Sequence, residues 1–222
     1  MASLYTSHTY LPCSPSDTLL IWTSIHLPLA WMAWMAWTLA AGSSRRRNGI
    51  HDMHAAVCGL LTSIGLSEGA TILLKFYVQR RRPNFYALCG WSSELLKCTA
   101  STQKIREASF SFPSGHSSLS SCAMVYLAWF CLSKVVAARG PRWLALVSCV
   151  LPVSWAFLVG ASRLADHWHH PSDVIAGLVL GSVCATVAFH TWYPPVWSAP
   201  QLVGLPWSLH NTDIAKLPSF LE

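Results

Sequence analysis

Five long apolar blocks restrict the fold of this chain more than any other feature. They cover residues 18–41, 54–74, 114–133, 143–161 and 173–193. Each block is close to the roughly 20 residues that a helix needs to cross the hydrocarbon core of a bilayer. Aromatic residues at block ends, such as Trp143, Trp192 and Tyr193, are typical of the headgroup zone. The blocks predict an all-α, polytopic transmembrane helical bundle of about five to six spans.

The composition supports this class and leaves room for one domain. Of the 222 residues, 53% are apolar and 11% are charged, against roughly 25% charged residues in a typical soluble domain. The mean hydropathy is +0.39. We expect a single membrane-embedded domain over residues 1–222, with a core at about 60–181 and a surface tail at 194–222. The first apolar block is too long for a cleavable signal, so no such leader is expected.

The basic residues are few and clustered. The net charge is +6, and arginines occur in runs at 45–47 and 80–82. The sequence has no long basic stripe and no nucleic-acid motif. We therefore expect no nucleic-acid partner, and we assign these charges to membrane orientation and phosphate binding.

Counting the spans places the polar loops on two sides of a membrane. Loops 42–53 and 134–142 share one side, and loops 75–113 and 162–172 share the other. The polar stretches that carry candidate chemistry all belong to the second side, as one shared site requires. The first side holds several basic residues, which favours a cytosolic location for it. These are Arg45, Arg46, Arg47, Lys134, Arg139 and Arg142. Loop 75–113 on the other side is as basic, however. We expect the site to face the lumen or the cell exterior, in an endomembrane or the plasma membrane.

The first polar stretch follows the second apolar block. Lys75 and Arg82 are seven residues apart, so they share one face if the helix continues beyond the membrane edge. Pro83 disfavours helical geometry at Arg82 and is expected to end the helix there. Two fixed cations side by side suit the non-bridging oxygens of a phosphate. A basic cluster that binds lipid headgroups has the same composition, so this stretch alone leaves both interpretations open.

The second stretch, residues 112–117, contains proline, serine, glycine and histidine. We expect Pro113 to open a helix, because its missing N–H would be unpaired in the first turn. The N–H groups of that turn would form an anion site. Gly115 allows close backbone approach, the Ser114 hydroxyl can donate, and His116 can protonate a leaving oxygen.

The third stretch begins the last apolar block. His169 and Asp173 are four residues apart, so their side chains can meet on one helix face. The carboxylate would hold one ring nitrogen as N–H and leave the other as a neutral nucleophile. Arg163 would be a further phosphate ligand. Two alternatives remain open. In the first, His167, His169 and His170 bridge lipid headgroups. In the second, Asp166, His167 and His170 form a zinc site, although no further ligands occur at recognisable spacing.

Other polar residues lie within or beside the apolar blocks. Glu68 is an intramembrane acid, for which a functional role and an internally paired structural role are both open. His26 and His54 present the same choice, and we favour structural roles for both. Gly177 and Gly181 form a GxxxG pattern, which favours packing between helices of this one chain.

Seven of the eight cysteines divide into two groups. Cys89 and Cys98 share one polar loop. A disulfide between them is expected only if that loop faces an oxidising compartment. Five others lie in or beside apolar blocks, and we expect them to be buried small hydrophobic residues: Cys58, Cys122, Cys131, Cys149 and Cys184.

Taken in order, the three polar stretches resemble the signature motifs of the type-2 phosphatidic acid phosphatase superfamily. The matching residues are Lys75, Arg82 and Pro83, then residues 113–116, then Ser162, Arg163, His169 and Asp173. All motif positions are present in the right order and at the right spacing, a combination far more specific than any one piece. The resemblance covers about residues 60–181 and is closest to the integral-membrane lipid phosphate phosphatases.

The resemblance implies a function. It implies a magnesium-independent phosphatase, without cofactors, for phosphatidate, lysophosphatidate, diacylglycerol pyrophosphate or sphingoid phosphates. In it, His169 attacks phosphorus and forms a phosphohistidine, Asp173 orients His169, and His116 protonates the leaving group. The other matched residues would hold the phosphoryl oxygens: Lys75, Arg82, Ser114, Gly115 and Arg163. A polyprenyl diphosphate phosphatase or a lipid phosphotransferase would use the same site, and a catalytically silent headgroup-binding protein is a different class.

The chain departs from the family pattern in two places. Members usually have one span more than the five blocks found here, and that span would precede Thr18. Residues 1–17 are too polar and too interrupted by proline to cross. Gln79 stands where close relatives have glycine, which weakens conclusions about the substrate rather than the reaction.

Overall fold

The computed structural model describes residues 17–39, 43–198 and 203–209. Over these ranges the regular secondary structure is helical apart from one short hairpin, in agreement with the predicted all-α class. Five of the helices are long and apolar enough to cross a membrane: α1, α2, α5, α6 and α7. The elements in order are α1 Asp17–Leu39, α2 Ser43–Val78, α3 Phe85–Leu88, β1 Trp91–Ser92, β2 Lys97–Cys98, α4 Thr102–Ala108, α5 Gly115–Ala137, α6 Arg142–Ala165 and α7 Pro171–Trp192.

Helices α2, α5 and α6 extend beyond the ends of the apolar blocks at one end or at both. α2 begins at Ser43, so most of the segment predicted as loop 42–53 is helical instead. The predicted loop 134–142 shortens to the four residues between α5 and α6. Polar residues such as arginine are good helix formers outside the bilayer. Hydropathy therefore located the spans but not the ends of the helices.

α2 ends at Val78, four residues before Arg82, and this corrects the predicted end at Pro83. Gln79 has a φ of 47°, the left-handed conformation that typically follows a helix. Its backbone N–H donates to the Lys75 carbonyl at 3.1 Å. Glycine adopts this conformation without steric cost, which is a structural reason for the glycine that the family resembled here has at this position. Lys75 and Arg82 consequently do not share one helix face.

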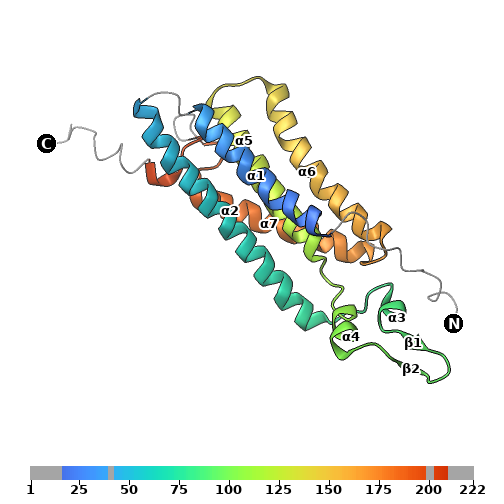
Figure 1. Cartoon of the computed structure of the whole chain (residues 1–222). Helices are drawn as coiled ribbons and strands as arrows, with labels where there is room; N and C mark the ends of the chain where they lie inside the picture. The colour runs from blue at the N-terminus through green and yellow to red at the C-terminus, as the bar shows by residue number, and fades with distance from the viewer. Residues whose placement is uncertain (1–16, 40–42, 199–202, 210–222) are drawn as a thin grey trace.

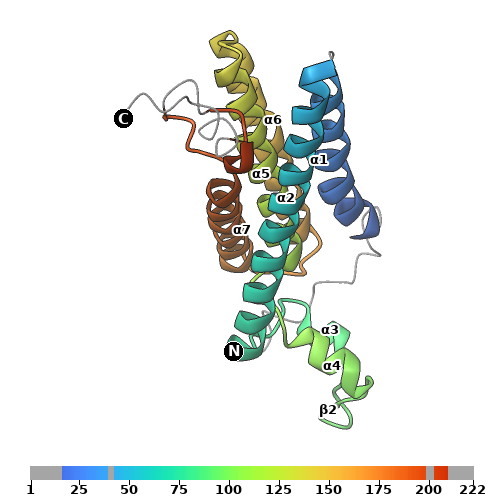
Figure 2. The same ribbon diagram turned by 90° about the vertical axis from the view of Figure 1, so that its left-hand side faces the viewer.

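α5 is the central helix of the bundle and packs against α1, α2, α6 and α7 (Figures 1 and 2). Its first half contains many small residues, which let neighbouring backbones approach closely. Its second half joins an aromatic core with the end of α7. There Phe189 stacks on Tyr193 at 5.1 Å between ring centroids, and Tyr126 meets Phe189 edge-on.

Two glycines of α7 set the closest helix contact. A Cβ atom on Gly177 would lie 2.6 Å from the Ser114 carbonyl oxygen, and one on Gly181 would overlap the Ser118 carbonyl oxygen. Both contacts lie within one chain, so the GxxxG prediction is confirmed. They hold the first turns of α5 and α7 side by side.

The opposite end of the bundle is fastened by a buried ion pair. Lys134 of α5 donates to both carboxylate oxygens of Asp52 at 2.7 Å and to the Gly204 carbonyl. Tyr193 donates to Asp52 at 2.8 Å. Lys134 is 7% exposed, so it is not the surface charge that the topology prediction used. Val203, Gly204 and Pro206 are buried, which corrects the prediction of a surface tail for this part; residues 199–202 and 210–222 lie outside the described residues.

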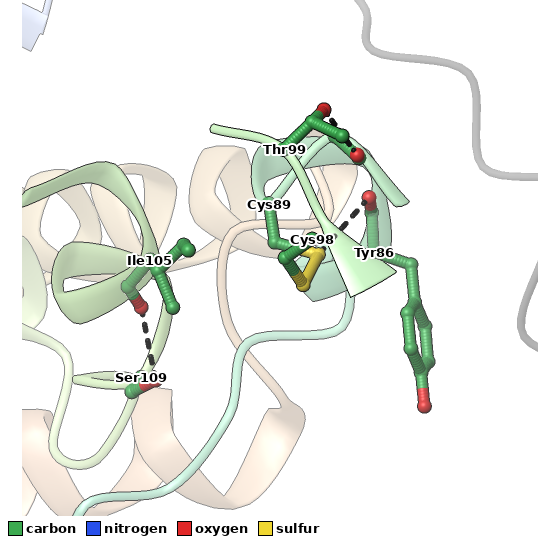
Figure 3. The surroundings of a disulfide bond; sticks show 7 residues. Tyr86, Cys89, Cys98, Thr99, Ile105 and Ser109 are labelled. Carbon is green, nitrogen blue, oxygen red and sulfur yellow. Dashed lines mark hydrogen bonds between the residues drawn. A yellow bond between two sulfur atoms is a disulfide. The ribbon is translucent and has the colours of Figure 1, made fainter. Parts of the chain in front are cut away.

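A small extramembrane unit follows α2 and lies beyond its end (Figures 1 and 2). It consists of α3, the β1–β2 hairpin and α4 around the buried side chains of Phe85 and Ala108. A disulfide joins Cys89 to Cys98 across it, with 5.2 Å between the Cα atoms (Figure 3). Of the other cysteines predicted to be buried, Cys122 and Cys131 are buried. Three are partly exposed instead: Cys58, Cys149 and Cys184.

Candidate active site

Backbone hydrogen bonds bring the three polar stretches together at one end of the bundle. The Arg82 N–H donates to the Ala108 carbonyl, and the Ser111 N–H donates to the Arg80 carbonyl, both at 2.9 Å. The Ser114 N–H donates to the Asp173 carbonyl at 3.0 Å. The chain after α2, the chain before α5 and the start of α7 are therefore bonded directly to one another.

The helix starts at this end have different caps. Pro171 occupies the first turn of α7, and the Asp173 carboxylate accepts the His170 N–H at 3.0 Å in a capping box. Pro113 does not open α5, contrary to the prediction. Ser114 is the N-cap, and its hydroxyl oxygen accepts the Ser117 N–H at 3.4 Å. Serine is among the preferred N-cap residues, so the helix begins one residue after it, at Gly115.

His169 is held by a backbone carbonyl rather than by a carboxylate. Its Nδ1 lies 2.8 Å from the Ser111 carbonyl oxygen. The Asp173 Oδ2 atom is 3.9 Å from Nδ1, beyond hydrogen-bond distance. The two side chains meet as predicted, at ion-pair distance, but the predicted hydrogen bond from the His169 ring to Asp173 is replaced by the one to Ser111. Because a carbonyl only accepts, Nδ1 carries the proton and Nε2 keeps its lone pair.

Asp173 is fully buried and surrounded by donors. Ser111 Oγ donates to Oδ2 at 2.5 Å, and Arg80 Nη1 donates to Oδ1 at 2.7 Å. His170 adds its backbone N–H at 3.0 Å and its ring Nδ1 at 3.2 Å. Arg80 also donates to the Ser172 hydroxyl at 2.6 Å. This set of bonds leaves the carboxylate ionised and fixed in position.

The pKa of His169 is about 3, far below its ordinary value of 6.5. Burial is the largest cause, since it penalises the charged ring. The positive charges of Arg82 and Lys75 lower the pKa further, whereas the Ser111 carbonyl and Asp173 raise it. The imidazole is consequently neutral at pH 7, as a nitrogen nucleophile must be.

The cations reach this end of the bundle from three directions. A Cβ atom on Gly115 would lie 3.2 Å from Lys75 Nζ, so the ammonium group sits at the first turn of α5. The Arg82 guanidinium lies over the Trp168 ring at 4.7 Å and donates to the Glu107 carbonyl at 3.1 Å. Arg163 is 1% exposed and donates to Asp166 at 3.1 Å. Together with a helix N-terminus, such cations can bind a multiply charged anion.

The other predicted residues take varied places. His116 is the second residue of α5 and is partly exposed, whereas Ser114 is fully buried. Glu68 has one carboxylate oxygen buried without a hydrogen-bond partner among the described residues, so its predicted choice of roles stays open. His26 stacks on Trp22 at 4.1 Å, and His54 lies 3.7 Å from the Cys58 sulfur. Both contacts fit the structural roles that we favoured.

Two residues of this site were missed by sequence reasoning. Arg80 was read only as one member of an arginine run, and Ser111 lies outside every motif. The sequence alone gives no signal for Ser111, because its contacts join residues 31 positions upstream and 62 positions downstream. For the zinc alternative, no group of three histidine, cysteine, aspartate or glutamate side chains within the described ranges is arranged to hold a metal ion. Asp166 instead pairs with Arg163, and His170 with Asp173.

The fold and the site define a polytopic membrane protein with histidines and basic side chains gathered at one end of the bundle. Residues 56–197 match the family model described as the PAP2 superfamily. The chain belongs to the PAP2 superfamily. The predicted family resemblance is confirmed.

Several curated proteins are similar to the chain. "Lipid phosphate phosphatase 2" of Arabidopsis thaliana is 34% identical over 158 residues, which cover 67% of this chain and 54% of that protein. "Phospholipid phosphatase 1" of Rattus norvegicus is 34% identical over 149 residues, 61% of this chain and 51% of that protein. The chain thus spans about half the length of the curated relatives it matches. No solved structure matches it.

Proposed function

We propose that this protein is a metal-independent lipid phosphate phosphohydrolase that acts through a phosphohistidine intermediate. One observation carries the proposal: the His169 Nδ1–H is fixed on the Ser111 carbonyl, which leaves Nε2 with its lone pair. Burial and the charges of Arg82 and Lys75, which lower the pKa of His169, keep that ring neutral at pH 7. The names of the relatives, which are lipid phosphate and phospholipid phosphatases, support the substrate class.

The proposed reaction has two displacements at phosphorus. In the first, the His169 Nε2 lone pair forms the N–P bond while the bond from phosphorus to the lipid oxygen breaks. His116 donates a proton to the leaving alkoxide. In the second, His116 takes a proton from water, the water oxygen bonds to phosphorus, and the N–P bond breaks. Inorganic phosphate and the free enzyme result. Asp173 takes no part in either proton transfer.

Positive charge does the work that a metal ion does in other phosphatases. The groups proposed to hold the non-bridging oxygens come from α2, the segment that follows α2, the start of α5 and the end of α6: Lys75, Arg82, Ser114, Gly115 and Arg163. Charge that builds on the transferring phosphoryl group is neutralised by these cations and by the α5 N-terminus. Ser114 accepts from Ser117 twice, which leaves its hydroxyl proton for a phosphoryl oxygen. Full turnover in a chelator is therefore expected.

The substrates proposed are phosphatidate, lysophosphatidate, diacylglycerol pyrophosphate and sphingoid phosphates. The support is the position of the site, at the end of helices that carry exposed apolar side chains along their length. A lipid whose chains lie in the bilayer brings its phosphate to this level. A polyprenyl diphosphate phosphatase and a lipid phosphotransferase are outcomes that the experiment below separates.

The site is proposed to face the lumen or the cell exterior. The supporting feature is the disulfide between Cys89 and Cys98, which closes the segment that follows the first motif. Disulfides persist in oxidising compartments and are rare in the cytosol. Labelling of these cysteines after reduction, with a membrane-impermeant maleimide on sealed cells or vesicles, tests the side. In inverted vesicles, whose lumenal face points outward, the cysteines should be labelled without permeabilisation. Labelling of such vesicles only after permeabilisation would contradict the proposal.

The central experiment measures phosphate release across a panel of lipid mono- and diphosphates in EDTA. His169→Gln and His169→Ala are compared with the wild type, and membrane insertion is verified by extraction into detergent. We expect both variants to insert and to lose at least roughly a thousandfold in kcat, as loss of a nucleophile does. A labelled, acid-labile phosphoenzyme should form in the wild type only. Equal phosphate release by wild type and His169→Gln would overturn the assignment, and transfer to an added alcohol would identify a phosphotransferase.

A further inference from the structure

Ser111 uses every polar group it has, and each one binds a different part of the site. Its N–H donates to the Arg80 carbonyl at 2.9 Å, and its hydroxyl donates to Asp173 at 2.5 Å. Its carbonyl accepts the His169 Nδ1–H at 2.8 Å. The side chain is fully buried. A buried residue bonded in this way is held in a single orientation. The Ser111 carbonyl in turn fixes the orientation of the His169 ring.

We propose that Ser111 is the positioning residue for the His169 nucleophile, and that Asp173 and Arg80 act on His169 through Ser111. This inference rests on the proposed function. It differs from the arrangement expected from the motif spacing, in which the carboxylate holds the ring directly.

Two distances decide between these arrangements. Nδ1 lies 2.8 Å from the Ser111 carbonyl and 3.9 Å from the Asp173 carboxylate, and only the first is a hydrogen bond. The nearer carboxylate oxygen, Oδ2, is occupied by the Ser111 hydroxyl, the His170 N–H and the His170 ring. Asp173 therefore anchors Ser111, and Ser111 anchors the ring.

Arg80 completes the arrangement as the counter-ion of Asp173. A fully buried carboxylate is costly unless a charged partner compensates it. Arg80 supplies that charge at 2.7 Å, and its backbone carbonyl also accepts from Ser111. Its Nη1 atom is committed to Asp173 and Ser172. Arg80 is thus a positioning residue, whereas Lys75 and Arg82 remain the proposed phosphate ligands.

The chemical consequence concerns the proton on Nδ1. When Nε2 bonds to phosphorus, the ring becomes cationic and its Nδ1–H becomes a stronger donor. The Ser111 carbonyl cannot accept that proton outright, so the proton stays on Nδ1 through both displacements. Asp173 stabilises the ring charge from 3.9 Å without becoming protonated.

The test compares Ser111→Ala with Ser109→Ala in the full-length protein. Ser109 lies in the same segment, and its hydroxyl donates only to the Ile105 carbonyl among the bonds described, at 3.0 Å. Loss of the hydroxyl frees Asp173 and loosens the carbonyl. We expect kcat of Ser111→Ala to fall by roughly ten- to a hundredfold, the worth of a hydrogen bond to a charged group, with KM nearly unchanged. Ser109→Ala should retain wild-type kcat.

A double-mutant cycle with Asp173→Asn tests the order of action. Residues that act as one unit give strongly non-additive losses. We expect Ser111→Ala combined with Asp173→Asn to lose little more than Asp173→Asn alone. Multiplying losses, or a Ser111→Ala variant as active as Ser109→Ala, would overturn the proposal.

Arg80→Gln approaches the same unit without altering Ser111. Its kcat should fall with little change in KM, and the loss should not multiply with that of Ser111→Ala. A rise in KM alone would instead make Arg80 a phosphate ligand and overturn its assignment. This route also decides the question if Ser111→Ala does not fold. A wild-type protein that releases no phosphate from any lipid would refute the proposed function itself, whereas these comparisons require an active wild type.

Discussion

The ionisation of His169 follows from where the ring lies. The unfolded chain binds a proton at this residue near pH 6.5, whereas the folded protein does so only near pH 3. Burial and the neighbouring cations cause the difference. Between these two values the unfolded state holds a proton that the folded state lacks, so stability falls as the pH falls through this window. At neutral pH both states are uncharged and the residue has no such effect.

This linkage gives a measurable difference between His169 and a neutral substitute. We expect wild-type protein to lose stability relative to His169→Gln as the pH falls below 6.5. The loss should be about 1.4 kcal/mol per pH unit, or about 2 kcal/mol at pH 5. Thermal unfolding of both proteins in detergent, from pH 7.5 to pH 5, measures it. A pH-independent difference between the two would show that the folded ring is charged in this range.

Residue types and their spacing predicted part of the candidate site. The sequence indicated the motif residues as candidates because each local pattern has its own chemistry, as with His169 and Asp173 four residues apart. Their exact contacts were not found, because Ser111 enters between them from a distant segment. Spacing along a helix reveals which side chains are able to meet. It does not reveal what a third segment places between them.

At the scale of elements, the contact between α5 and α7 is the one on which the site geometry most depends. Both helices start at the site, and Ser114 is bonded to Asp173 across their first turns. Gly177 and Gly181 permit this approach, since a side chain at either position would meet the backbone of α5. The pattern of small residues predicted a close contact, but its partner helix became clear only from the fold.

Gly181→Ala is expected to force α5 and α7 apart. The added Cβ atom would overlap the Ser118 carbonyl oxygen, and backbone cannot rotate out of the way as a side chain can. We expect a loss of about 1–3 kcal/mol in stability, the usual cost of overpacking, together with reduced turnover. Gly65→Ala is the matched control, because nothing lies within 4 Å of its added atom. It should be neutral or stabilising by up to about 1 kcal/mol; equal melting temperatures of the two variants would contradict the packing role.

The ends of the elements were harder to predict than their existence. Apolar length identified all five spanning helices in the described chain. It did not place the end of α2, which is set by the left-handed Gln79 and its bond to Lys75. That end matters for function, because it turns the chain so that Arg80 meets Asp173 and Arg82 approaches α4.

In the whole molecule, the candidate active site lies at one end of the helical bundle and a buried ion pair lies at the other. The first gathers histidines and cations around the starts of α5 and α7. The second joins α2, α5, α7 and residues 203–206 through Lys134, Asp52 and Tyr193. The sequence did not reveal this second cluster, because its members lie 82 residues apart for Lys134 and Asp52 and 141 apart for Tyr193 and Asp52. The hydropathy pattern placed Lys134 in the predicted loop 134–142, as one of its basic residues.

Lys134→Met should expose what the buried pair contributes to the molecule. Removing the ammonium leaves the Asp52 carboxylate buried with only the Tyr193 hydroxyl and no counter-charge among the described residues, which costs about 3–5 kcal/mol. It also releases the Gly204 carbonyl, so residues 203–206 should detach and become accessible to protease.

Lys134→Met combined with Asp52→Leu removes both charges and is expected to be more stable than Lys134→Met alone. Melting temperatures and limited proteolysis in detergent measure these effects. Below the melting temperature, the proteins should keep wild-type KM, because the pair lies at the opposite end of the bundle from His169. A double variant less stable than Lys134→Met would mean that Asp52 is held by something other than this lysine.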